Sequence, residues 1–282
     1  MKNLKYLPLL ILAIVLLGCS FTVNVPSVDT STSQYFEISQ AVPAGIKDAE
    51  VMIEMGGGRL NLSGGSSKLV EGTVVYNVSD WKPTVSLSDN RLLISQDQTS
   101  NVGIPTGNIK NDWSLKLGAL PTALKISAGA YEGVIDLSGL SLTDLEINDG
   151  ASKATVRFDT ANPVKMDRLT YKTGASTVKL IGLANANTSE ISFSSGAGDY
   201  TLDFSGELSQ DLDAKIESGL SQVKIIVPKN THTIVNLGGG LSNVDAQGTW
   251  TKSSSQFEAS GSGSTITIDV EMAVGNLVLQ QN

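Results

Sequence analysis

His232 is the only histidine among the 282 residues, and it is the one side chain of the type usually expected of a general base at neutral pH. A serine nucleophile beside it would be expected on a Gly-x-Ser-x-Gly elbow, which the sequence lacks. One histidine and one cysteine also fall short of the common zinc ligand sets. The sequence therefore predicts no catalytic, cofactor-binding or metal-binding residues and a protein that is not an enzyme.

Carboxylates are the remaining candidates for catalysis. Asp136, Asp203 and Asp245 occur at similar places in three of the repeats, and pairs of carboxylates roughly 5–10 Å apart hydrolyse glycosidic bonds. We expect these aspartates to share one outward-facing column with Arg157, Lys179 and Lys224. Basic neighbours keep carboxylates ionised, so this pattern favours a ladder of ion pairs over a general acid. A calcium-dependent polysaccharide-degrading enzyme of the β-helix type stays open as an alternative.

Cys19 is the only cysteine, and its thiol is a candidate for acylation. It ends a Leu-Leu-Gly-Cys sequence that follows two lysines and the apolar residues 7–17. Eleven apolar residues are too few for a membrane-spanning helix, which needs roughly 20. The pattern resembles the bacterial lipobox and predicts a signal peptide over residues 1–18, cleaved before a lipidated Cys19. Two or three acyl chains would hold the protein stably on a membrane, outside the cytoplasm in the bacterial cell envelope. The leaflet is left open.

Residues 19–40 are rich in serine and threonine and predict a flexible tether behind the lipid. Without the two lysines of the signal peptide the chain carries 18 basic and 28 acidic side chains, a net charge of −10. This acidity excludes nucleic acid as a partner. Besides the membrane, the expected partners are an envelope protein or a cell-surface glycan.

A glycine-punctuated repeat fills the rest of the chain. Seven short alternating segments end on a glycine and continue into a second alternating segment, and the glycines lie 21 to 24 residues apart, at Gly129, Gly150, Gly174, Gly196, Gly219, Gly240 and Gly263. A fixed period of this length is typical of a solenoid, because one unit cannot bury its apolar face alone. We expect an all-β, parallel solenoid over residues 122–282, with glycines that turn the chain at positive φ.

Alternation assigns the two faces of the strands. The apolar pairs that follow the glycines are expected inside, in stacked columns that begin with Ile135 and Leu137. The last apolar strand, residues 266–279, would be an exposed edge unless another segment covers it, and could then pair with a membrane partner.

The segment 41–121 combines the repeat with antiparallel strands. Residues 51–62 contain the same glycine signature, and Leu60 and Leu62 would match Ile135 and Leu137. Residues 72–78, 84–88 and 91–95 then predict an antiparallel meander, with Asp89-Asn90 as the turn between the last two strands.

Two passages, residues 56–65 and residues 120–145, resemble the toast-rack domain family of bacterial envelope proteins. That family is similar to the C-terminal domains of cell-wall-stress response regulators and to candidate adhesin head domains. The resemblance covers about residues 45–282. It implies a right-handed β-helix-like stack, attachment to a membrane and no defined functional residues. The sequence thus predicts a non-enzymatic, lipid-anchored β-solenoid scaffold for surface binding, adhesion or envelope-stress sensing.

Overall fold

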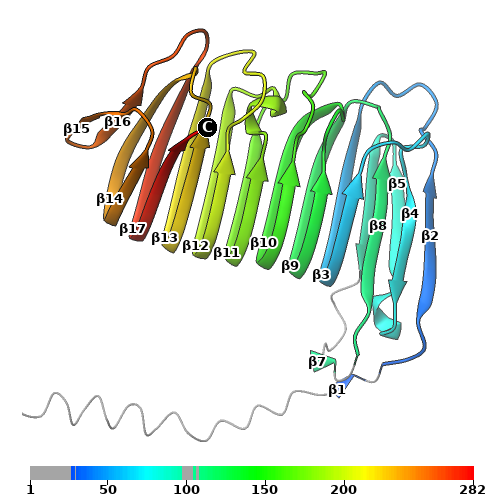
Figure 1. Ribbon diagram of the computed structural model, residues 1–282. Coiled ribbons are helices and arrows are strands. Elements are labelled where there is room, and N and C mark those ends of the chain that lie inside the picture. Colours follow the sequence, from blue (N-terminus) through cyan, green and yellow to red (C-terminus); the bar gives the residue numbers. More distant parts are fainter. Residues whose placement is uncertain (1–26, 29, 97–103, 106–107) are drawn as a thin grey trace, which may run out of the picture.

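The computed structural model describes residues 27–28, 30–96, 104–105 and 108–282. The expected signal peptide and Cys19 lie outside the described residues and stay predictions. Nearly all strands join one sheet in the order β15-β16-β14-β17-β13-β12-β11-β10-β9-β3-β8-β4-β2, with β6 and β5 attached to β3 (Figure 1). The short strands β1 (Ser27–Val28) and β7 (Ile104–Pro105) form a separate parallel pair. Two 3₁₀ turns complete the described elements: η2 (Ser79–Trp81) and η3 (Leu183–Ala186).

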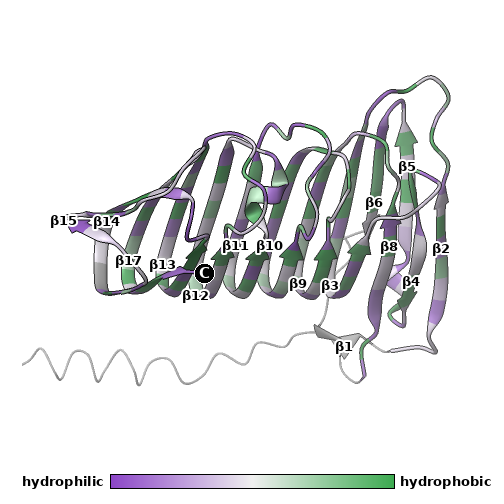
Figure 2. Ribbon diagram, turned by 45° about the horizontal axis from the view of Figure 1, so that its top comes forward, coloured by the Kyte–Doolittle hydropathy of each residue, from purple (hydrophilic) through white to green (hydrophobic). Residues whose placement is uncertain are grey.

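The repeats form long parallel strands stacked side by side, one per repeat. In order they are β9 (Thr122–Asp136), β10 (Leu142–Arg157), β11 (Leu169–Ile181), β12 (Glu190–Asp203) and β13 (Leu212–Val227). In β9 the buried side chains alternate up to Ile126, two consecutive exposed residues follow at Gly129 and Ala130, and alternation resumes at Tyr131. This change of phase divides each strand at its glycine into a first and a second arm. Figure 2 shows the alternation as bands of hydrophobic and hydrophilic residues along the strands. The all-β solenoid is confirmed.

We call the point where the two arms of a strand meet its corner. The glycines at the corners are required because neighbouring coils approach too closely there for a side chain. A Cβ at Gly174 would lie 2.4 Å from the carbonyl oxygen of Gly150, and one at Gly219 would lie 2.4 Å from that of Gly196. None of the glycines at positions 129, 150, 174, 196 and 219 has a positive φ, so the expected left-handed turn is wrong there. Gly263 does have a positive φ of 83°, but it lies in the connection before β17 and not in the column of corner glycines.

The register differs from the expected one by two residues in half of the coils. Arg157 pairs with Asp136 on one side but with Ile181 on the other, and Lys179 pairs with Thr155. The expected single column of charges is therefore wrong, and it splits into two neighbouring columns. One contains Asp136, Arg157 and Asp203, and the other contains Lys179, Lys224 and Asp245. A slip of two residues keeps every side chain on its face, so alternation alone cannot detect it.

At the N-terminal end the stack changes from parallel to antiparallel pairing, as predicted. β3 (Ala49–Ser63) pairs with β9 along its length, but on its other side the first arm pairs with β6 (Arg91–Gln96) and the second with β8 (Asn111–Leu117). Antiparallel partners follow: β5 (Pro83–Ser88) on β6, and β4 (Val70–Tyr76) and β2 (Gln34–Gln40) beyond β8. The predicted meander is correct only for its last two strands, because β4 pairs with β8 and β2 and not with β5. Residues 34–40, expected at the end of the flexible tether, form β2 of the sheet. Leu62 lies opposite Ile135 and Leu60 opposite Gly133, again two residues from the expected match.

At the C-terminal end the chain order and the spatial order differ. The last strand, β17 (Thr265–Gln281), lies between β13 and β14 (His232–Gln247), so the expectation of an exposed C-terminal edge is wrong. The hairpin of β15 (Thr251–Ser253) and β16 (Gln256–Ala259) then pairs with the first arm of β14. β17 buries five aliphatic side chains to 1% exposure or less: Ile266, Ile268, Val270, Leu277 and Leu279. The more apolar strand thus takes the position with neighbours on both sides, where it buries most area.

A polar network lies inside the corner between neighbouring coils. The Asp149 carboxylate accepts hydrogen bonds from the hydroxyls of Tyr171 (2.7 Å) and Thr173, and Tyr131 lies 3.5 Å from Tyr171 between hydroxyl oxygens. Burial raises the pKa of both tyrosines, so they remain hydrogen-bond donors across the physiological range. The network connects three consecutive coils, β9, β10 and β11, through polar groups at the margin of the apolar core.

Candidate functional site

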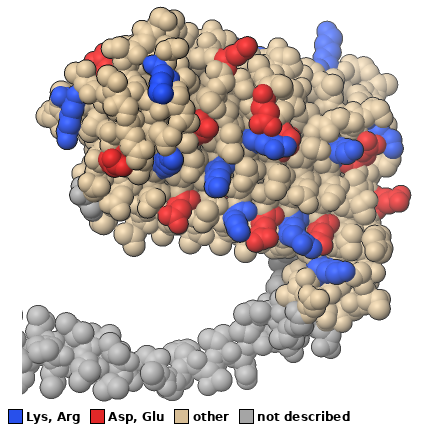
Figure 3. All heavy atoms as spheres, in the orientation of Figure 1, with Lys and Arg blue, Asp and Glu red and all other residues tan. Residues whose placement is uncertain are grey.

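A shallow groove of about 640 Å³ crosses the outer face of the second arms at the N-terminal half of the stack. Six strands contribute side chains to it: β2, β4, β8, β3, β9 and β10. Its lining includes Glu37, Ser39, Asn61, Ser63, Lys68, Glu71, Thr73, Ser114, Lys116, Val134, Asp136 and Arg157. In the view of Figure 3, acidic and basic side chains are interspersed across the molecule.

The strand register arranges the groove floor in rows that run across the strands. In one row Glu37 pairs with Thr73, Thr73 with Ser114, Ser114 with Asn61, and Asn61 with Val134. Thr155 of β10 extends this row to six strands. At about 4.8 Å between strands, the row measures roughly 24 Å. Strand alternation points all of these side chains to the same outer face. The row therefore presents the hydroxyls of Thr73, Ser114 and Thr155 and the amide of Asn61, with Glu37 at one end and the apolar Val134 between Asn61 and Thr155.

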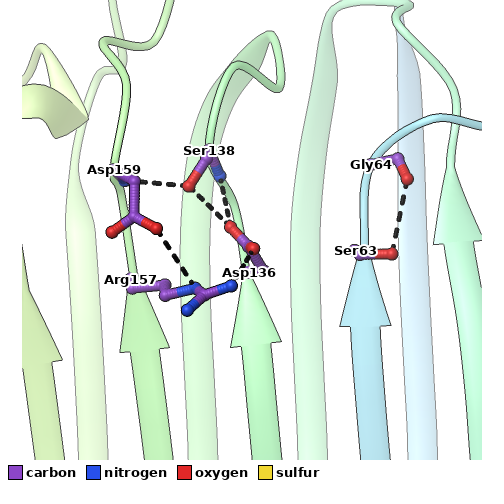
Figure 4. Close-up of polar contacts among 6 residues, drawn as sticks. All are labelled: Ser63, Gly64, Asp136, Ser138, Arg157 and Asp159. Atoms are coloured by element: carbon purple, nitrogen blue, oxygen red, sulfur yellow. Dashed lines mark hydrogen bonds and ion pairs between the residues drawn. The ribbon is translucent and has the colours of Figure 1, made fainter.

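An ion-pair cluster forms one end of the groove. Arg157 donates to Asp136 at 2.5 Å, and its Nε lies 3.5 Å from a carboxylate oxygen of Asp159 (Figure 4). Ser138 Oγ also donates to Asp136 at 2.6 Å. Burial acts to raise the pKa of Asp136, but the hydrogen bonds from Arg157 and Ser138 outweigh it and lower the pKa. Asp136 is therefore a fixed anion and is unsuited to serve as a general acid.

We expect the substitution Arg157→Gln to raise the pKa of Asp136, because burial remains when the guanidinium is removed. A lowered pKa stabilises the fold above the unfolded value near 3.8, and this stability is lost as pH falls through the folded value. The wild type should therefore exceed the variant in stability at neutral pH and lose that advantage in acid. Carboxyl ¹³C NMR titration measures the pKa directly. Lys179→Gln, which removes a cation from the neighbouring column, is the control, and an unchanged Asp136 titration in Arg157→Gln would contradict the assignment.

The other end of the groove contains a second, looser set of charges. Lys68 Nζ donates to Ser39 Oγ at 2.7 Å and lies 3.9 Å from a Glu71 oxygen. Lys116 and Glu37 have no ion pair with any described residue. The groove thus offers one unpaired charge of each sign beside its row of hydroxyls.

The structure does not bring the expected catalytic candidates together. Asp136 and Asp203 share a column but are separated by Arg157 and Ile181, and Asp245 belongs to the other column. His232 lies at the opposite end of the stack, with Nε2 3.0 Å from Glu258 and Nδ1 3.1 Å from the Thr265 hydroxyl. Within the described residues, no three histidine, cysteine or acidic side chains gather in a way that could hold a metal ion. The same part of the chain has no helix long and apolar enough to span a membrane.

The comparison with family models identifies the architecture. The model described as the N-terminal domain of toast-rack (DUF2154) matches residues 26–168 and 161–226. The chain belongs to the toast-rack family. The match spans the groove, the antiparallel N-terminal strands and the coils up to β13. No curated protein matches this toast-rack chain.

Three solved structures are similar to this toast-rack protein over most of its length. A candidate cell adhesion protein from Clostridium sporogenes is 22% identical, with a TM-score of 0.48 over 89% of this chain and 99% of that one. A candidate adhesin from Bacteroides fragilis is 11% identical, with a TM-score of 0.38 over 89% of this chain and 100% of that one. A candidate lipid-binding protein from Parabacteroides distasonis is 11% identical, with a TM-score of 0.30 over 91% and 100%. These similarities are too low for a function to be transferred.

Sequence reasoning did not find the groove. Alternation within residues 70–76 and 111–117 does show which side chains face outward, Lys116 among them. The alternation does not indicate which strands are neighbours, because β4 and β8 join the repeats through β3 and not in chain order. Of the charged residues singled out from sequence, Asp136 and Arg157 line the groove.

Proposed function

We propose that this toast-rack protein is a non-enzymatic, lipid-anchored component of the bacterial cell envelope that binds an extended polar polymer, a surface glycan, in the groove across its second arms. The exposed row across six strands, in which Thr73, Ser114, Asn61 and Thr155 supply hydroxyl and amide groups, carries this proposal. A glycan offers hydroxyls and amides along its length, and such a row can hydrogen-bond to several successive sugar units. Binding of this kind needs no moving part and no acid–base pair.

The charges of the groove support binding over hydrolysis. Asp136 is held as an anion by Arg157, and the next acidic side chains of the lining, Glu37 and Glu71, lie on β2 and β4, across β8 and β3 from it. Glycoside hydrolysis needs one carboxyl group with a raised pKa beside a second carboxylate. This groove therefore suits recognition of a polymer that remains intact.

A lipid at Cys19 would hold the groove close to the membrane. Fourteen residues, 20–33, lie between Cys19 and the first residue of β2, and an extended chain spans at most about 3.5 Å per residue. The groove strand β2 would thus lie within roughly 50 Å of the bilayer surface. A polymer bound there is one that runs near the membrane.

Groove binding is tested with Ser114→Arg. Ser114 is exposed in the middle of the floor, so a long cationic side chain there should block the row without disturbing the core. We expect binding to insoluble wall and capsule polymers, measured by co-sedimentation, to fall at least about tenfold, which corresponds to about 1.4 kcal/mol. Thr177→Arg adds the same side chain to the same face outside the groove and should bind normally. Equal binding by both variants, or calcium-dependent release of sugar ends by the wild type, would refute the proposal.

The anchor is tested separately with Cys19→Ser. We expect a labelled fatty acid fed to cells to appear on the wild-type chain and not on the variant, because the chain has no other thiol to acylate. The variant should also leave the membrane fraction. Equal labelling of both chains would exclude lipidation at Cys19 and leave the groove proposal standing.

A further inference from the structure

One strand edge stays open at the C-terminal end of the stack. β14 pairs with β17 up to Gln247, but on its other side β16 covers only residues 233–236 (Figure 1). Residues 243–247, in the second arm of β14, have no strand on their outer side in the described part of the chain. An open edge presents unpaired backbone N–H and C=O groups that can pair with another strand.

The interior is also incompletely covered at this edge. Val244 and Ala246 belong to the inward columns of Leu277 and Leu279, and those leucines are fully buried. Val244 and Ala246 themselves are only half-buried, because no further coil lies against them. A strand added to β14 would continue both apolar columns and would pair the free backbone N–H and C=O groups of the edge.

We propose that a second copy of this chain supplies that strand, and that two β14 edges pair antiparallel about a two-fold axis. The charges at the two ends of the sheet favour this arrangement over a head-to-tail one, in which the two ends of the sheet would pair with each other. Stacking β2 of one copy on β14 of another would place Glu37 beside Asp245, because the two residues occupy the same column at opposite ends of the sheet. Like charges directly opposite each other destabilise strand pairing, so a filament built in the register that continues this column is disfavoured.

The two-fold arrangement centred on Val244 opposes no like charges and pairs an amide with a carboxylate. It places Asp245 of each copy opposite Asn243 of the partner subunit, so the asparagine amide donates to the carboxylate at two equivalent sites. It also sets the two Val244 side chains against each other over the interior. A centre at Asp245 would instead oppose two carboxylates. Asn243 and Asp245 are both exposed, so either can be substituted without disturbing the core.

Native mass spectrometry of the full-length protein in detergent tests the pairing at micromolar concentration. We expect a dimer for the wild type. Asn243→Asp should weaken dimerisation about tenfold, because it opposes two pairs of carboxylates. The double variant Asn243→Asp with Asp245→Lys should restore it, since each new aspartate then faces a lysine. Asn276→Asp makes the same charge change in the same column one strand inward and should leave the dimer intact.

A monomeric wild type overturns the proposal, and so does a dimer that Asn243→Asp leaves unchanged. A dimer weakened equally by Asn276→Asp also overturns it, because the contact would then lie on the sheet face and not on the edge. Groove binding plays no part in these outcomes, so the failure of one proposal does not affect the other.

Discussion

Gly174→Ala should destabilise this protein by about 3 kcal/mol, although the residue it changes is exposed. The added Cβ would lie 2.4 Å from the carbonyl oxygen of Gly150, a backbone atom held by the neighbouring coil. The corner cannot yield at one coil without disturbing the next, because Gly196 packs on Gly174 in the same way. For a domain of this size we expect thermal unfolding, followed by circular dichroism, to move down by roughly 6–12 °C.

Gly56→Ala is the matched control in the same column. Nothing lies within 4 Å of a Cβ at Gly56, because there the sheet divides between β6 and β8 and no coil stacks on the corner. Its φ is not in the left-handed region, so alanine should stabilise the fold slightly, by about 0.4–1 kcal/mol, through the unfolded chain. Equal effects of the two substitutions on stability would show that the strand propensity of alanine, and not the close approach of neighbouring coils, determines the cost of replacing these glycines.

Asp149→Ala is expected to cost about 2–4 kcal/mol through a different mechanism. The substitution removes the acceptor of the Tyr171 and Thr173 hydroxyls inside the corner. Thr173 retains Ser176 as a partner at 2.5 Å, but Tyr171 is left with only the long contact to Tyr131. A buried donor without an acceptor pays its full desolvation cost. Urea unfolding measures the loss.

Two further variants separate the network from the strand itself. Asn148→Ala changes the adjacent residue, whose side chain donates to Glu146 on the outer face, and should alter the stability by less than about 0.5 kcal/mol. Tyr171→Phe in the Asp149→Ala background should cost less than in the wild type, because the bond it removes is already gone. Additive losses in this double-mutant cycle would disprove the coupling.

The local pattern was sufficient for the architecture of the coils. Six of the seven glycines about 22 residues apart predicted one coil each, in β9 to β14, whereas Gly263 follows the β15–β16 hairpin and marks no coil. The alternation around Ile135 and Val156 correctly placed these side chains in the core. The antiparallel strands before the repeats were also predicted, including the turn at Asp89, whose φ is 54°. These features depend on neighbours within a few residues along the chain, which is the range that a sequence pattern reports directly.

The groove could not be predicted in the same way, because it depends on which strands become neighbours. Lys116 and Asp136 face the same groove only because β8 joins the repeats through β3. Arg157 was expected between Asp136 and Lys179; it does lie beside Asp136, but Ile181 takes the place of Lys179. A shift of two residues leaves each strand equally well buried, so small differences in packing and hydrogen bonding across strands choose the register.

The amino-acid sequence by itself determined the repeat, the inward and outward faces and the toast-rack family, since each follows from short-range spacing of apolar residues and glycines. Only the tertiary structure decided the register of the charges, the line of groove residues and the insertion of β17 between β13 and β14. The last of these illustrates the physical reason. β14 and β17 have the same alternation, and their places are set by competition for the doubly paired position, in which the strand that buries more apolar area is favoured.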